Sequence, residues 1–183
     1  MEFRLTYQGL LPSNGSAQEK HLIRRQLHIQ LKELWNQIPL SHHQDFLKFP
    51  NKDVSVIRQL GGFDFAVLVC EQLKLYAEID VVLLRPGPLG GLITKGGDID
   101  NRLKTLFDAL RYPKELQELA KGFAPSEDEK PFFCLLEDDQ LITKVSVSVD
   151  RLLTPAGSGD VHLLLHVKVR GSDVIWGNMS LTS

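Results

Sequence analysis

One run near the middle of the chain, residues 97–110 with the sequence GDIDNRLKTLFDAL, constrains the fold more than any other stretch. Its apolar side chains have the i, i+3, i+4, i+7 spacing of a buried helical stripe, namely Leu103, Leu106, Phe107 and Leu110. Asp100, Lys104 and Asp108 recur every four residues and therefore share a different face. The run predicts an amphipathic helix from residue 98 to about residue 112.

The start of this predicted helix carries groups that suit a metal ion and a phosphate. Asp98 and Asp100 are two residues apart, and Mg²⁺ prefers oxygen ligands and is often held by one or two carboxylates. Lys104 lies one turn further on, where an ammonium group can hold a phosphate beside the metal. Two simpler interpretations stay open, because either aspartate can cap the helix and Lys104 can pair with the acidic residues four positions away.

The remaining pattern predicts an α+β fold in which a mixed β-sheet packs against two main helices. We expect a helix over residues 17–37, ended by Pro39, and a hairpin at Gly61-Gly62. Further strands and loops follow from alternation and from turn residues: strands at 3–7, 54–60, 63–69, 75–85, 142–149 and 161–169, a connection at 40–53 and a loop at 86–97. At 183 residues the chain is expected to be a single domain.

Acidic residues are concentrated in one part of the chain. The net charge is −2, but residues 113–139 hold three Lys/Arg and eight Asp/Glu, so the rest of the chain sums to +3. A basic surface elsewhere is therefore compatible with the composition. We interpret residues 113–133 as an inserted acidic segment, with a short helix at 114–121.

Composition narrows the cellular setting. The N-terminus lacks an apolar run after positive charge, and the longest apolar stretches are too short to span a bilayer. The two cysteines, Cys70 and Cys134, have no metal-binding spacing and form no disulfide framework. These features favour a reduced, cytoplasmic protein that does not act at a membrane.

The 98–110 run resembles the central motif of the RusA family of Holliday-junction resolvases, D-x-D-N-x-x-K-x-x-x-D-A-L, with every fixed position present. Two further features match in family order. Asp138-Asp139 stands just before a predicted strand, and Leu11-Pro12-Ser13-Asn14 follows the first strand, like the family's N-terminal turn.

The resemblance implies a small α/β fold and a homodimeric, Mg²⁺-dependent endonuclease that cuts four-way DNA junctions by paired nicks, with Mn²⁺ as a possible substitute. Carried over by position, Asp98, Asp100 and Asp139 are the metal ligands and Lys104 is the catalytic or phosphate-contacting lysine. A metal ion held by carboxylates acts as a Lewis acid and lowers the pKa of bound water, and a lysine stabilises developing charge. Taken alone, Asp138-Asp139 can also be a solvated acidic turn, and Asp108 is better explained as a salt-bridge residue than as a ligand.

The chain departs from the family at the residues before Asp98. The family member known best to us has a dense arginine run there, where this chain has Lys95-Gly96-Gly97. Phosphate neutralisation supplies much of the affinity for DNA, so other cations would have to provide it. We expect DNA contacts from Lys95 and from cations elsewhere in the chain: Lys20, Arg24, Arg25, Arg102, Arg111 and Lys144.

Two other classes of function remain open. The low net charge and the missing arginine run are compatible with a non-catalytic module of the same fold that binds DNA junctions. The acidic cluster is also compatible with a structural protein that binds a metal only for stability.

Overall fold

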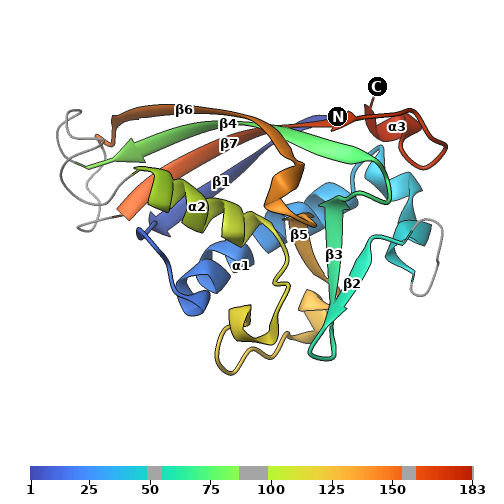
Figure 1. Cartoon of the computed structure of the whole chain (residues 1–183), viewed down its shortest axis with the longest axis horizontal. Helices are drawn as coiled ribbons and strands as arrows, with labels where there is room; N and C mark the ends of the chain where they lie inside the picture. The colour runs from blue at the N-terminus through green and yellow to red at the C-terminus, as the bar shows by residue number, and fades with distance from the viewer. Residues whose placement is uncertain (49–54, 87–98, 154–159, 183) are drawn as a thin grey trace.

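The fold was analysed in a computed structural model that describes residues 1–48, 55–86, 99–153 and 160–182. The described residues form two β-sheets with helices packed against them (Figure 1). The predicted α+β class with a mixed sheet is confirmed, and the strands divide into a four-stranded and a three-stranded sheet, each with both parallel and antiparallel pairs.

The larger sheet has the order β1-β7-β4-β6. Its strands are β1 (Glu2–Leu10), β7 (Asp160–Gly171), β4 (Leu75–Arg85) and β6 (Ile142–Arg151). β7 runs antiparallel to both of its neighbours, whereas β4 and β6 are parallel. Side chains alternate strictly along β4, where the odd-numbered residues from 75 to 83 are buried and the even-numbered ones lie on the more exposed face.

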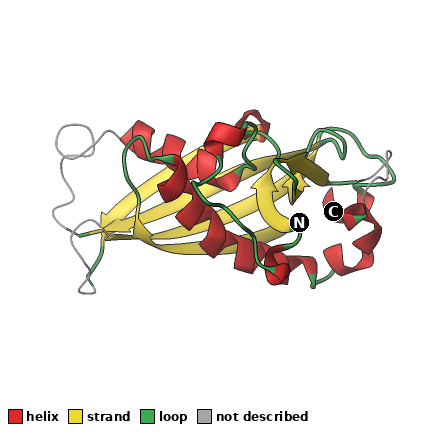
Figure 2. Ribbon diagram, turned by 90° about the horizontal axis from the view of Figure 1, so that it is seen from below, coloured by secondary structure: helices red, strands yellow, loops and turns green. Residues whose placement is uncertain are grey.

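Two helices cover the buried face of this sheet: α1 (Ala17–Trp35) and α2 (Ile99–Leu110) (Figure 2). α1 begins with a capping box, in which Ser16 and Glu19 satisfy each other's backbone N–H groups. Its apolar face contributes Ile23, Leu27 and Leu31 to the core. α1 ends two residues before the predicted end and α2 also ends two residues early, at Leu110.

The smaller sheet consists of β2 (Ile57–Leu60), β3 (Phe63–Val69) and β5 (Phe132–Leu136). β2 and β3 form the predicted hairpin, and both turn glycines, Gly61 and Gly62, have positive φ. β5 pairs in parallel with β3 and was not predicted as a strand. All five of its residues are buried, so its sequence FFCLL lacks the alternation that would have marked a strand.

The connections contain short helical turns. The predicted irregular segment at 40–53 includes 3₁₀ turns at Leu40–His42 and Gln44–Leu47, and the predicted helix at 114–121 is reduced to the turn Leu116–Glu118. Three further short elements complete the chain: turns at Glu127–Glu129 and Asp139–Leu141, and α3 (Met179–Thr182). Nearly all of the predicted 86–97 loop lies outside the described residues.

The acidic segment at 113–133 is attached to α1. Arg25 donates two hydrogen bonds to the carboxylate of Glu129, at 2.5 and 2.9 Å. Lys32 Nζ donates to the Asp128 carbonyl at 2.6 Å. Phe123 packs edge-on against His21 and Phe63. The segment is therefore part of the packed domain.

α1 also closes the outer edge of β1. Gln30 Oε1 accepts the Thr6 N–H at 2.8 Å, and Gln30 Nε2 donates to the Thr6 carbonyl at 2.7 Å. Gln26 makes the same pair of contacts with Gln8, at 3.4 and 3.1 Å. Two glutamines one helical turn apart thus replace a neighbouring strand along this edge.

Two observations concern the predicted cellular compartment. No helix in the described part of the chain has the length and apolar character needed to cross a bilayer. Cys70 and Cys134 are buried and unpaired, and burial raises the pKa of both thiols.

Candidate functional site

The predicted site helix is present as α2, and the solvent exposure of its charged residues decreases from the first turn to the last. Asp100, in the first turn, and Lys104, one turn later, are exposed. Among the residues that the structure describes, neither has an ion-pair partner within 4.0 Å, so the open alternative that Lys104 pairs with its acidic neighbours is not observed. Asp108, on the same face two turns after Asp100, is only 9% exposed.

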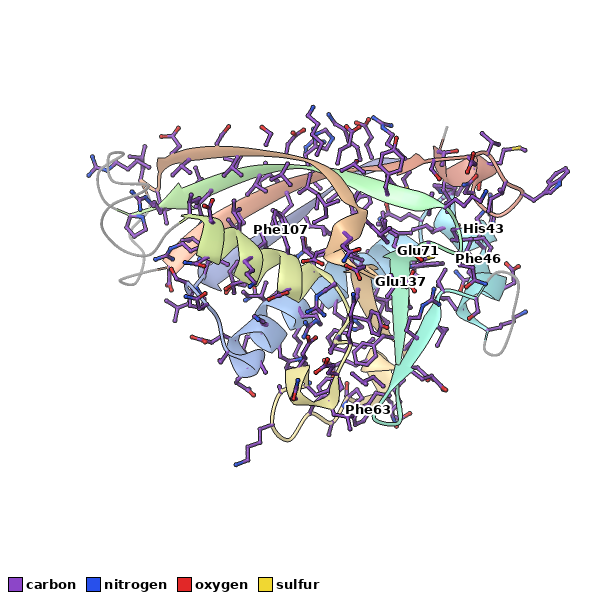
Figure 3. The ribbon with its side chains drawn as sticks, viewed as in Figure 1. His43, Phe46, Phe63, Glu71, Phe107 and Glu137 are labelled. Atoms are coloured by element: carbon purple, nitrogen blue, oxygen red, sulfur yellow. The ribbon has the colours of Figure 1, made fainter. Side chains whose placement is uncertain are left out.

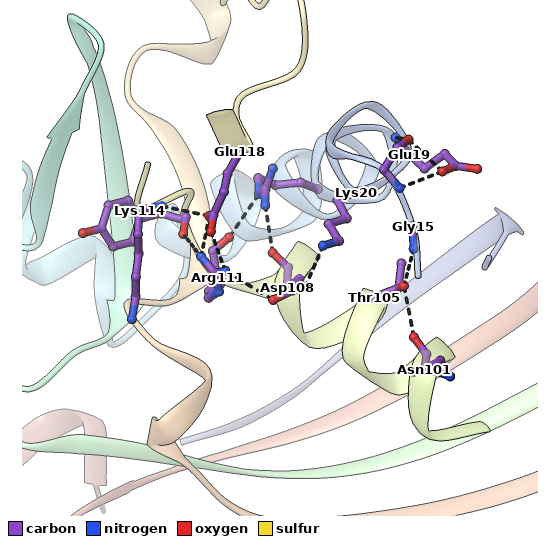
Figure 4. A network of polar contacts seen from close by, with 12 residues as sticks. Gly15, Glu19, Lys20, Asn101, Thr105, Asp108, Arg111, Lys114 and Glu118 are labelled. Carbon is purple, nitrogen blue, oxygen red and sulfur yellow. Dashed lines mark hydrogen bonds and ion pairs between the residues drawn. The ribbon is translucent and has the colours of Figure 1, made fainter. Parts of the chain in front are cut away.

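Asp108 belongs to a charged cluster between α1 and α2 (Figure 4). Its carboxylate lies 2.7 Å from Lys20 Nζ and 3.3 Å from Arg111 Nη2. Arg111 also holds the carboxylate of Glu118 at 2.8 Å, and this hydrogen bond raises the pKa of Arg111. The prediction that Asp108 is a salt-bridge residue is confirmed.

Arg24 ties α1 to the end of α2. It is 3% exposed, and it donates from Nε to the Arg111 carbonyl at 3.0 Å and from Nη2 to the Asp108 carbonyl at 2.8 Å. These carbonyls belong to the C-terminal end of α2, where backbone acceptors lack partners within the helix. A guanidinium in this position does not face solvent, so the prediction that Arg24 contacts DNA is wrong.

The other predicted DNA-contacting cations differ in how they are placed. Arg25 is paired with Glu129, and Arg102 donates to the Leu11 carbonyl. Lys144 is exposed on β6, and Lys95 lies outside the described residues. DNA contacts from these cations, and from Lys20 and Arg111 in the charged cluster, stay predictions.

The turn at residues 11–15 packs on the first half of α2. The Gly15 N–H donates to Thr105 Oγ1 at 2.9 Å, and this hydroxyl in turn donates to the Asn101 carbonyl at 3.1 Å. A Cβ on Gly15 would lie 2.6 Å from Thr105 Cγ2, so this close approach requires glycine. Arg102 of α2 also donates to the Leu11 carbonyl, so two of the three sequence features that resemble the RusA family are in contact. Sequence reasoning missed Gly15 and Thr105, because no local pattern links residues that are 90 positions apart.

The third feature is the acidic turn at residues 137–139, in which two carboxylates pair with residues of the same chain and one is exposed. Glu137 pairs with Arg58 at 2.6 Å and accepts the Glu71 N–H at 2.9 Å (Figure 3). Asp138 caps the turn Asp139–Leu141, accepting the Gln140 N–H at 2.9 Å, and it also pairs with Lys114. Asp139 is exposed. It is thus the member of the predicted acidic pair whose carboxylate faces solvent.

Asp100 and Asp139 lie toward opposite ends of α2. The start of α2 is near the end of β4, since Arg85 acts electrostatically on Arg102. The acidic turn leads directly into Ile142, which pairs with Ala77 near the start of β4. Eight residues of extended strand separate Ala77 from Arg85, which is about 26 Å. The described residues of one chain therefore do not bring Asp100 and Asp139 to a common metal ion.

The predicted metal triad is only partly described. Asp98 lies outside the described residues, and the described residues contain no group of three His, Cys, Asp or Glu side chains that could hold a metal ion. Coordination by Asp98, Asp100 and Asp139 stays a prediction.

The start of α2 carries a carboxylate, Asp100, and an ammonium group, Lys104, which suit a hard cation and a bound anion. A carboxylate in the first turn of a helix and an ammonium group one turn later can together hold a hard cation and an anionic oxygen. Both side chains are exposed, so a large substrate can reach them. No protein-family model matches this chain, and a search of curated proteins finds no relative.

Proposed function

We propose that the protein is a Mg²⁺-dependent endodeoxyribonuclease that acts on branched DNA, as the resemblance to the RusA family implies. The observation that carries the proposal is the exposed pair Asp100 and Lys104 on one face of α2. The contact between Gly15 and Thr105, together with the Asp108 cluster, holds this helix in place from both ends.

The proposed chemistry assigns a role to each residue. Asp98 and Asp100 hold the cation through carboxylate oxygens, the ligand type that Mg²⁺ prefers and for which Mn²⁺ can substitute. When bound, the cation supplies a Lewis acid and an activated water. Lys104 stabilises the negative charge that develops on the phosphate. Asp139 is the third carboxylate of the set. Because Asp100 and Asp139 of one chain lie toward opposite ends of α2, the Asp139 that completes the site has to come from a second copy of the chain.

We further propose a cytoplasmic homodimer. Two free, buried thiols are compatible with a reducing compartment. Two paired nicks on a symmetric junction call for two active sites related by a two-fold axis.

The decisive experiment compares a synthetic four-way junction with a linear duplex of the same sequence, each with Mg²⁺ and with EDTA. The wild type is expected to cut the junction only with Mg²⁺. Asp100→Asn and Lys104→Met are expected to lower the rate at least about 100-fold, because the first weakens the ligand set of the cation and the second removes the positive charge that stabilises the reacting phosphate. Asp64→Asn, an exposed aspartate on β3, is the matched control and should retain activity.

The outcomes separate the possibilities. Absence of metal-dependent cleavage of either substrate would overturn the proposal. Equal cleavage of junction and linear duplex would keep the nuclease and discard the selectivity for branched DNA.

A non-catalytic junction-binding module of the same fold is the second candidate. The separation of Asp100 from Asp139 within one chain favours it. It predicts tight binding of the junction, measured by fluorescence anisotropy, without metal-dependent turnover.

A further inference from the structure

β6 forms one edge of the larger sheet, at the top of the view in Figure 1. The opposite edge, β1, is closed by Gln26 and Gln30 of α1. In the described part of the chain, β6 has a strand on one side only. An edge strand of this length offers its free backbone N–H and C=O groups to another strand.

The sequence of β6 is complementary to itself in the antiparallel direction. Residues 144–150 read KVSVSVD, and Val147 is the central residue. If two copies are paired antiparallel about Val147, Lys144 stands opposite Asp150, Val145 opposite Val149, and Ser146 opposite Ser148. Opposite charges and β-branched pairs placed directly across from each other stabilise antiparallel strands.

The valines of β6 are not fully covered within one chain. They lie on the same face of the sheet as Ile79, Val81 and Leu83, with which they are in register. Whereas those β4 side chains are at most 2% exposed, Val145 is 41% exposed and the other two valines are half-buried. A second copy of β6 would cover this apolar strip and satisfy the open edge at the same time.

We propose that β6 is the surface through which two copies of this chain form a symmetric dimer. The two strands pair antiparallel across a two-fold axis at Val147, which joins two four-stranded sheets into one continuous sheet. Lys144 and Asp150 set the register, and the valines supply the apolar contact. This interface does not depend on the proposed nuclease activity, and its tests use neither DNA nor metal.

The first test reverses charges and follows the molar mass by light scattering coupled to size exclusion, over a dilution series. The wild type is expected to be a dimer. Asp150→Lys sets lysine against lysine, and Lys144→Asp sets acid against acid, so each should raise the dissociation constant at least about 10-fold. An equimolar mixture of the two variants should dimerise again, because each charge then meets its opposite. Asp64→Lys, on the other sheet, is the matched control and should remain a dimer.

The second test reads the register with cysteines. Val147→Cys would meet its own copy across the axis, at the Cα separation of 4.5–5.5 Å typical of antiparallel neighbours, and should form an intermolecular disulfide under mild oxidation. Val145→Cys would lie four residues out of register with its own copy, about 13 Å away, and should not. The native thiols, Cys70 and Cys134, are buried and do not interfere. Circular dichroism checks that each variant is folded.

Three results would overturn the interface. The first is a wild type that stays monomeric across the dilution series. The second is a dimer that both charge reversals leave intact. The third is cross-linking of Val145→Cys without cross-linking of Val147→Cys.

Discussion

At the residue scale, two aspartates on one face of α2 have different environments. Asp100 is exposed in the first turn, whereas Asp108 is covered by α1 and meets Lys20 and Arg111. Sequence spacing places both on the same face but does not say which end of that face the neighbouring helix covers. The charge of Asp108 therefore stabilises the contact between the helices, whereas Asp100 has no ion-pair partner among the described residues and is exposed to a ligand.

This difference predicts opposite behaviour of two matched variants. Asp108→Asn should lower the free energy of unfolding by about 1–3 kcal/mol, because Lys20 loses its buried partner and Arg111 keeps only Glu118. Asp100→Asn should change it by less than about 0.5 kcal/mol, as is usual for an exposed site. Urea denaturation measures both values. Equal effects of the two substitutions would contradict the assignment.

His21 provides a prediction about pH. Burial, reinforced by Arg24 and Arg25, lowers the pKa of His21 from its ordinary value of 6.5 to about 4. Between these two values the unfolded chain binds a proton at His21 and the folded chain does not. The stability should therefore fall as the pH decreases from about 6.5 to about 4.

The variant His21→Phe tests this link. It keeps an aromatic ring beside Phe123 and Phe132, and it removes the titrating group. The pH dependence of the free energy of unfolding, measured by urea denaturation at several pH values, should become shallower than that of the wild type. His28, whose pKa is also lowered by burial, should account for part of the slope that remains. Identical slopes in the two proteins would argue against the role of His21.

At the element scale, α1 stabilises the sheet in two ways. Its apolar face packs into the core, and its glutamines complete the edge of β1. Gln26→Ala combined with Gln30→Ala would leave backbone groups of Thr6 and Gln8 without these partners. These groups lie at an exposed edge where water can replace the lost contacts, so the expected loss is about 1 kcal/mol.

The same double variant should also aggregate more readily, since an open edge can pair with another chain. Static light scattering during a thermal ramp measures this tendency. Gln18→Ala, an exposed glutamine of the same helix, is the control and should behave as the wild type. A double variant that neither loses stability nor aggregates would show that the edge contacts contribute little.

At the scale of the whole molecule, the proposed β6 interface and the proposed active site are geometrically related. α2 runs antiparallel to β6, with Asp100 toward one end of the sheet and Asp139 toward the other. The proposed two-fold axis at Val147 would reverse the second subunit. It would place Asp100 of one subunit and Asp139 of the partner subunit toward the same end of the joined sheet.

An experiment that mixes two variant subunits tests this arrangement, and it rests on both the proposed nuclease activity and the proposed β6 dimer. Dimers of Asp100→Asn alone, and of Asp139→Asn alone, should be inactive on the four-way junction. Heterodimers formed by refolding the two variants together should recover nicking of one strand, because one of their two shared sites is intact. If heterodimers form and remain inactive, each site is built from a single chain or is not catalytic.

The local pattern of apolar and polar residues predicted the helices and strands that have one buried face and one exposed face. The bounds of β4 are as predicted because its side chains alternate between a buried and an exposed face, and the stripe of Leu106 and Leu110 marked α2. β5 escaped prediction because both of its faces are buried, so its residues show no period. Arg24 was misassigned to DNA binding for a related reason, since a charged residue gives no sign in sequence that a neighbouring helix will bury it.

The sequence by itself determined the α+β class, the helix with Asp100 and Lys104 on one face, and the glycine turn of the hairpin, because these depend on neighbours a few residues away. Only the tertiary structure decided that the strands form two sheets, that Asp108 and Arg24 serve packing, and that Asp139 lies far from Asp100. Those outcomes depend on contacts between segments far apart in the chain, 87 residues for Arg24 with Arg111 and 166 for Glu2 with Lys168, and no local period records such contacts.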